Sequence, residues 1–157
     1  MNKEQQTPQR IRKSEWYEVV VRYDRQMEDG ITKKVTESYI VDAFSFAEAE
    51  ARTIAEMQQF VNVAVDVRNI TPCPFSEIIF NDPVDDDRWY KARLAFITID
   101  EKSEKEKYSY VYYLVQAATF ERAKTYITQA MSGTMLDYVI KSIKETKYIE
   151  VFEHTSK

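Results

Sequence analysis

Hydrophobic and polar residues alternate along the first part of the chain, after a polar start. From residue 17 to residue 23, every second residue is one that suits a protein core: Tyr17, Val19, Val21 and Tyr23. A period of two predicts a strand with one buried face. Gly30 lies in the polar turn that follows and supplies the positive φ that a hairpin turn often needs. Residues 34–43 are then expected to return as a second strand.

The hydrophobic period next changes to that of a helix. Ser45 occupies an N-cap position and Glu48 follows three residues later, which is the spacing of a capping box. Apolar residues at helical spacing predict an amphipathic helix over residues 46–59.

Two further strands are expected to complete the first half. Alternating valines over residues 61–67 predict a third strand, which Pro72 and Pro74 should interrupt. Residues 76–80 predict a short terminal strand.

The same order of elements is expected again in residues 84–157. The predicted strands cover residues 90–99, 108–116, 136–143 and 148–152. Thr119 is expected to cap the second helix, and Gly133 to end it as a left-handed residue. The connector, residues 81–88, is rich in Asp, but its spacing does not fit a calcium-binding loop. We interpret its carboxylates as a solvated linker: Asp82, Asp85, Asp86 and Asp87.

Individual residues also match between the two halves. Trp16-Tyr17 recurs 73 residues later as Trp89-Tyr90, and residues 39–46 recur 74 residues later as 113–120. A match that keeps its register across separated segments indicates an internal duplication. Each unit is β-β-α-β with a short extra strand, the third strand beside the first and the helix on one face. The sequence thus predicts an α+β fold, a tandem duplication with antiparallel-rich sheet or sheets, two helices and ferredoxin-like overtones.

This pattern divides the chain into three parts. Residues 1–15 are expected to be a disordered polar tail, and residues 16–83 and 84–157 are the two repeats. A unit of this length would be marginally stable alone, so one shared core is expected.

Charge and cysteine content limit the partners and the compartment. The net charge is −4, made up of +2 in residues 1–15, −6 in residues 16–83 and zero in residues 84–157. No segment is basic enough to predict duplex DNA as a partner. A single cysteine, no apolar run long enough for a membrane span and no signal-peptide core favour a cytoplasmic protein without membrane contact.

Few residues suit catalysis, and no cofactor or metal is expected. The two glycines cannot build a phosphate-cradling loop. Cys73 and His154 lack the other ligands of a zinc site, and we interpret them as a small buried or semi-exposed thiol and a tail imidazole, not a nucleophile pair. An enzyme would need a carboxylate pair, such as Asp42 with an acid from the other half. We interpret Asp42 instead as complementing the dipole of the first helix.

The best candidates for binding are the residues expected to point away from the helices. They combine aromatic rings with cations: Trp16, Arg22, Trp89, Lys91, Arg93, Tyr108, Tyr110 and Tyr112. Such a sheet face can be covered by the other repeat, can meet a protein partner or a second subunit, or can bind single-stranded nucleic acid through stacking and phosphate contacts.

Some of these segments resemble a known family. The Trp-Tyr strands, together with residues 39–51, 89–92 and 113–117, resemble an uncharacterised domain-of-unknown-function family of Bacteroidota and their phages. The resemblance covers about residues 15–153 and implies a bacterial or phage cytoplasmic protein. It implies no activity and no functional residues.

Two functions therefore remain open from the sequence. The first is a non-enzymatic module that engages a protein partner, or another copy of itself, through a sheet face or the groove between the repeats. The alternative is a single-stranded nucleic-acid-binding protein of a replication or mobile-element system. The salt dependence of binding distinguishes them, because phosphate contacts release counterions.

Overall fold

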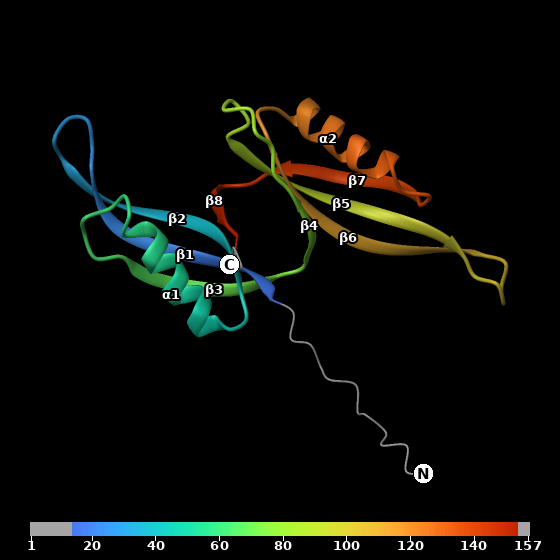
Figure 1. Ribbon diagram of the computed structural model, residues 1–157, viewed down its shortest axis with the longest axis horizontal. Coiled ribbons are helices and arrows are strands. Elements are labelled where there is room, and N and C mark those ends of the chain that lie inside the picture. The colour runs from blue at the N-terminus through green and yellow to red at the C-terminus, as the bar shows by residue number, and fades with distance from the viewer. Residues whose placement is uncertain (1–13, 154–157) are drawn as a thin grey trace, which may run out of the picture.

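The computed structural model describes residues 14–153, which form eight strands and two helices (Figure 1). In chain order these are β1 (Glu15–Gln26), β2 (Thr32–Ala43), α1 (Phe46–Met57), β3 (Asp66–Cys73), β4 (Phe75–Ile79), β5 (Arg88–Ile99), β6 (Glu106–Ala117), α2 (Phe120–Ser132), β7 (Asp137–Glu145) and β8 (Tyr148–Phe152). β1 begins at Glu15, one residue inside the segment expected to be a tail, and residues 1–13 of that segment lie outside the described residues.

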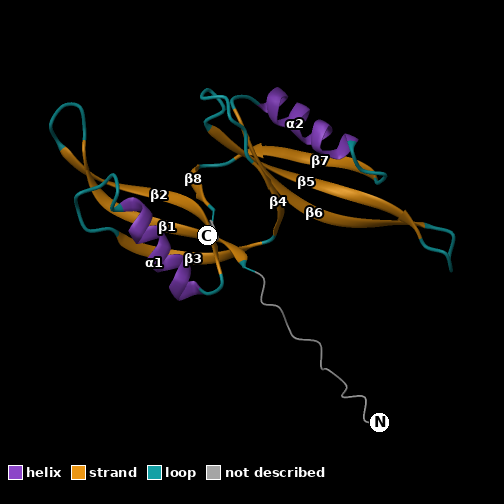
Figure 2. Ribbon diagram, viewed as in Figure 1, coloured by secondary structure: helices purple, strands orange, loops and turns teal. Residues whose placement is uncertain are grey.

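The strands form two mixed sheets of four strands each. Sheet A has the order β3-β1-β2-β8, and sheet B has the order β4-β6-β5-β7. Figure 2 shows α1 lying across one face of sheet A and α2 across one face of sheet B. The predicted α+β class with two similar halves is confirmed, and β3 lies beside β1 as expected. The origin of the halves by duplication stays a prediction.

The short strands β4 and β8 are exchanged between the halves. β4 pairs in parallel with β6, and β8 pairs in parallel with β2, so each sheet takes its last strand from the other half of the sequence. Only Pro74 separates β3 from β4, and only two residues separate β7 from β8. Neither link forms a hairpin, and each short strand continues across to the other sheet (Figure 1).

Three hydrophobic clusters follow from this exchange. One lies between α1 and sheet A, and another between α2 and sheet B. The third joins both halves through Ile40, Phe75, Trp89, Leu114 and Val151. Trp16, Ile78 and Tyr148 pack against it, so most of its members are residues that match between the two halves.

The third strand lies further along the chain than the valine pattern predicts. Val61 and Val65 do pack against the first cluster, but from the segment that follows α1, and the strand itself begins at Asp66. The Val61 N–H donates to the Met57 carbonyl, so this segment is still tied to the helix end. Pro72 lies within β3 rather than breaking it, because β3 is an edge strand, where a missing N–H is tolerated.

The helix caps are formed largely as predicted. Ser45 Oγ accepts a hydrogen bond from the Glu48 N–H at 3.1 Å, and the Glu48 carboxylate accepts one from the Phe44 N–H at 3.2 Å. Thr119 Oγ1 caps α2 in the same way, accepting a hydrogen bond from the Arg122 backbone N–H at 3.1 Å. Gly30 has the expected positive φ of 82°. The left-handed conformation predicted for Gly133 is wrong: its φ is −83°, and α2 ends in a right-handed turn closed by the Thr134 N–H on the Met131 carbonyl.

The connector between the halves contains a buried carboxylate. Asp86 is 1% exposed, which contradicts a fully solvated linker. Its carboxylate accepts hydrogen bonds from the Ala118 N–H (2.7 Å), Arg122 Nη2 (3.1 Å) and the Tyr126 hydroxyl (2.5 Å). Asp86 therefore fixes the connector to the start of α2. Asp85 stays largely exposed and forms an ion pair with Nη1 of Arg122.

Candidate functional site

The face of sheet B opposite α2 carries most of the predicted binding residues. We call it the outer face of sheet B. Tyr108 and Tyr110 of β6 are 44% and 50% exposed there, and Tyr112 is half-buried. On the neighbouring β5, Arg93 lies opposite Tyr112 in the antiparallel ladder, and Lys91 lies two residues further along the same face. Alternation along β5 and β6 thus gathers aromatic rings and cations into one surface.

Each of these tyrosine rings has a cation beside it. The Arg93 guanidinium carbon is 4.1 Å from the centre of the Tyr110 ring, and Lys91 Nζ is 4.6 Å from that of Tyr112. Lys141 Nζ of β7 lies 5.9 Å from the Tyr108 ring. Cation–π contacts of this kind hold the rings in place while leaving the cation free to bind an anion.

Next to these tyrosines, the outer face of sheet B contains a recess of about 310 Å³, which we call the cationic recess. The residues that line the cationic recess are Lys91, Arg93, Tyr112, Ser142 and Lys144. Three of them are cations and none is an acid. In the part of the chain that the structure describes, none of these three cations forms an ion pair.

The positions of these cations also cost free energy in the fold. Lys91 and Lys144 stand directly opposite each other in the β5–β7 ladder, an arrangement in which like charges are destabilising. Arg93 Nε is buried, and among the described residues it is the one buried side-chain nitrogen or oxygen without a hydrogen-bond partner. A buried donor without a partner costs free energy. An anion placed in the recess would relieve the repulsion between Lys91 and Lys144.

The first half of the chain provides a comparison within the same molecule. The residues of sheet A at the matched positions are Glu18, Val20, Ser38, Asn69 and Thr71. They keep the same register, with Glu18 opposite Thr71 and Val20 opposite both Ser38 and Asn69. The same local fold is therefore built without any cation at these positions, so the fold does not require Lys91, Arg93 and Lys144.

The other predicted binding residues are not part of this surface. Trp89 is 1% exposed and Trp16 is half-buried, because the junction of the halves covers the ends of β1 and β5 where they lie. The prediction that Trp89 faces a ligand is therefore wrong. Arg22 is exposed, but it belongs to sheet A, opposite Thr36 and Asp66.

Sequence reasoning missed the contribution of β7. Lys141, Ser142 and Lys144 were placed at or near a strand end without any binding role. A signal was present: the matched residues of the first half are Arg68, Asn69 and Thr71, so the two halves differ in charge at Lys144. They differ in charge at Lys91 too, where the first half has Glu18.

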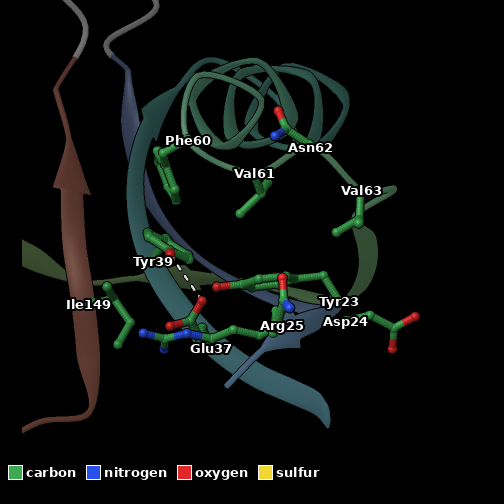
Figure 3. A pocket seen from close by; sticks show the side chains of 11 residues that line it. Tyr23, Asp24, Arg25, Glu37, Tyr39, Phe60, Val61, Asn62, Val63 and Ile149 are labelled. Carbon is green, nitrogen blue, oxygen red and sulfur yellow. Dashed lines mark hydrogen bonds between the residues drawn. The ribbon is translucent and has the colours of Figure 1, made fainter. Parts of the chain in front are cut away.

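A larger recess of about 570 Å³ lies on sheet A near the end of α1 (Figure 3). Its floor holds Glu37, which accepts a hydrogen bond from the Tyr39 hydroxyl at 3.3 Å and interacts with Tyr23. Phe60 and Ile149 at its sides are 58% and 48% exposed. The carboxylate of Glu37 already accepts a hydrogen bond, and no described residue that lines this recess has a buried side-chain nitrogen or oxygen without a partner.

The tyrosines of this larger recess predict how stability depends on alkaline pH. Burial and the neighbouring Glu37 raise the pKa of Tyr23 to about 12, and burial also raises the pKa of Tyr39. Since the fold favours the neutral phenols, their contribution to stability is complete below the ordinary tyrosine pKa, about 10, and is lost as the pH rises towards about 12. Thermal unfolding followed from about pH 8 to about pH 12 should show this fall, and Tyr23→Phe should make it shallower. An unchanged pH profile in Tyr23→Phe would contradict the assignment.

Two further candidates for chemistry gain no support from their surroundings. Burial raises the pKa of the Cys73 thiol, and Glu18 adds to the effect, so the thiol is protonated at neutral pH. His154, its suggested partner, lies outside the described residues. No group of three or more His, Cys, Asp or Glu side chains within residues 14–153 is arranged to hold a metal ion. Asp42 is the penultimate residue of β2, where its backbone carbonyl accepts a hydrogen bond from Arg52.

These features define an α+β protein with two similar halves and a cationic, aromatic face on the second. The chain belongs to the family described as Domain of unknown function (DUF4494), whose profile matches residues 15–154. Searches of curated proteins and of solved structures found no match. Among the described residues, neither helix has the length and apolar character of a membrane span. The bacterial or phage origin and the cytoplasmic location stay predictions.

Proposed function

We propose that this protein is a non-enzymatic binding module and that it binds single-stranded nucleic acid along the outer face of sheet B. The observation that carries the proposal is the set of unpaired cations beside exposed tyrosine rings, present in the second half and absent from the matched positions of the first.

Single strands suit this surface chemically. Unpaired bases stack on aromatic side chains or on arginine planes, with about 1–3 kcal/mol for each base, and their phosphates bind lysine and arginine. Tyr108 and Tyr110 offer exposed rings on alternate residues of one strand, and Arg93 offers a guanidinium plane next to them. Lys91 and Lys144 lie within reach of a sugar–phosphate backbone that runs along Tyr108 and Tyr110.

A protein partner or a second copy of the chain is the alternative occupant. The outer face of sheet B also has an apolar part, including Val139, which is 41% exposed opposite Ala95. A partner of that kind would bind through apolar contacts with little dependence on salt, and it would have to supply acids for the cationic recess. Duplex DNA is not expected, because the chain carries a net charge of −4 and this face only a few cations.

Fluorescence anisotropy of a labelled oligo-dT tests the proposal. We expect binding at low salt that weakens as salt is added, with a slope of about −2 to −3 in a plot of log affinity against log salt, for three or four phosphates contacted. A duplex of the same length should bind more weakly. Absence of oligo-dT binding at low salt, or binding without salt dependence, would contradict the proposal and favour a protein partner.

A further inference from the structure

The outer face of sheet B is open at one end and closed at the other. At the open end the β5–β6 hairpin projects away from the rest of the molecule (Figure 1). At the closed end the residue that follows Lys91 on this face is Trp89, which is buried in the shared cluster and covered by Phe80 at a ring-centre distance of 5.7 Å. A single-stranded nucleic acid bound along Tyr108 and Tyr110 therefore reaches no further exposed part of this face beyond the cationic recess.

The cations are concentrated at the closed end. Lys91, Arg93 and Lys144 line the cationic recess, whereas Lys141 is the cation beside Tyr108 at the open end. Lys91 also lies 5.9 Å from the ring of Phe75, a strand β4 residue from the other half of the sequence, which places it at the junction. The positive charge is therefore greatest at the end where the exposed part of the outer face of sheet B stops.

We propose that the cationic recess binds the terminal phosphate of a single-stranded nucleic acid, so that the protein recognises a strand end. This inference rests on the function proposed above and specifies which part of the nucleic acid is recognised. A phosphate monoester carries a charge of about −1.5 to −2 at neutral pH, against −1 for each internal phosphodiester. Three cations that form no ion pair favour the more highly charged group.

Ser142 and Tyr112, which both carry hydroxyl groups, complete the lining of the recess. Both are donors of hydrogen bonds to phosphate oxygens, as in other phosphate contacts. Nothing in this chemistry depends on whether the phosphate is at the 5′ or the 3′ end, so both ends belong in the test.

The experiment compares labelled oligo-dT of about ten nucleotides, within the usual site size, in four forms: with a 5′-phosphate, with a 3′-phosphate, with hydroxyls at both ends, and circular. We expect one of the phosphorylated forms to bind at least tenfold more tightly than the hydroxyl form, and the circle to bind no better than the hydroxyl form. Inorganic phosphate should compete most strongly with the phosphorylated form.

Lys144→Thr provides the variant, because threonine is the residue at the matched position of the first half. It should remove most of the difference between phosphorylated and hydroxyl ends. Arg22→Ala, on the exposed surface of sheet A, is the matched control and should preserve the difference.

The outcomes separate the two proposals. Equal affinity for all four forms, the circle included, would overturn end recognition while leaving the single-strand function in place. Absence of binding by every form would overturn both. A preference for a phosphorylated end that Lys144→Thr leaves unchanged would place the terminal phosphate outside the cationic recess and contradict the inference.

Discussion

The triple variant Lys91→Glu, Arg93→Val and Lys144→Thr is expected to lose oligo-dT binding while keeping or gaining stability. These substitutions install the residues found at the matched positions of the first half, which folds with them in the same register. Each charged contact to a phosphate contributes about 1.5–3 kcal/mol, so the affinity should fall by more than about 100-fold.

Stability is the more diagnostic readout of this variant. The substitutions remove the opposition of Lys91 and Lys144 and the buried Arg93 donor without a partner. Both features cost free energy in the fold, and their removal offsets the loss of the cation–π contacts to Tyr110 and Tyr112, so the melting temperature should stay about the same or rise. A surface that is held at a cost to stability is typical of a functional site.

The control for the triple variant is Arg22→Ala, which removes an exposed cation from the other sheet. Anisotropy titrations should show little change in its affinity. A drop of several degrees in the melting temperature of the triple variant would mean that the three cations support the fold, and the argument for a ligand would fail.

The second large effect is expected at Asp86. Asp86→Ala leaves the Ala118 N–H, the Arg122 guanidinium and the Tyr126 hydroxyl without their shared acceptor. Removing one partner from a buried ionic group costs about 3–5 kcal/mol, so the melting temperature should fall by about 10 °C. Differential scanning calorimetry measures this change directly.

Asp85→Ala is the matched control for that effect. Its carboxylate is also within 2.9 Å of Arg122, but its side chain is 74% exposed, and exposed ion pairs contribute little to stability. The two neighbouring substitutions should therefore differ widely. Similar melting temperatures for both variants would show that the buried contacts of Asp86 do not hold the connector to α2.

Local features of the sequence predicted most elements of the fold. The period of two in residues 17–23 and the caps at Ser45 and Thr119 depend on interactions between residues close in the chain, and the structure forms them as expected. The valines over residues 61–67 were misassigned because a segment that follows a helix can also bury alternate side chains. The conformation of Gly133 was wrong because a helix can also end in a right-handed turn, which needs no glycine.

The candidate site was predicted only in part. Alternation along the second half indicated that Lys91, Arg93 and the three tyrosines share a face, and the structure brings them together on the outer face of sheet B. Trp89 was expected on the same face by the same rule, but what covers it comes from the other half of the chain. The role of β7 was missed because a third strand adds its residues to a surface only through pairing.

By itself, the sequence determined the α+β class, the repeated order of elements and the alternation that places cations beside tyrosines, because these depend on residues within a few positions of one another. The tertiary structure alone decided the exchange of β4 and β8, the burial of Asp86 and Trp89, and the cationic recess at one end of the outer face of sheet B. Each of these depends on pairing or packing between segments 30 or more residues apart in the sequence, such as β4 with β6 and Asp86 with Tyr126. No local pattern records such a partner, since the same alternation suits a strand wherever it pairs.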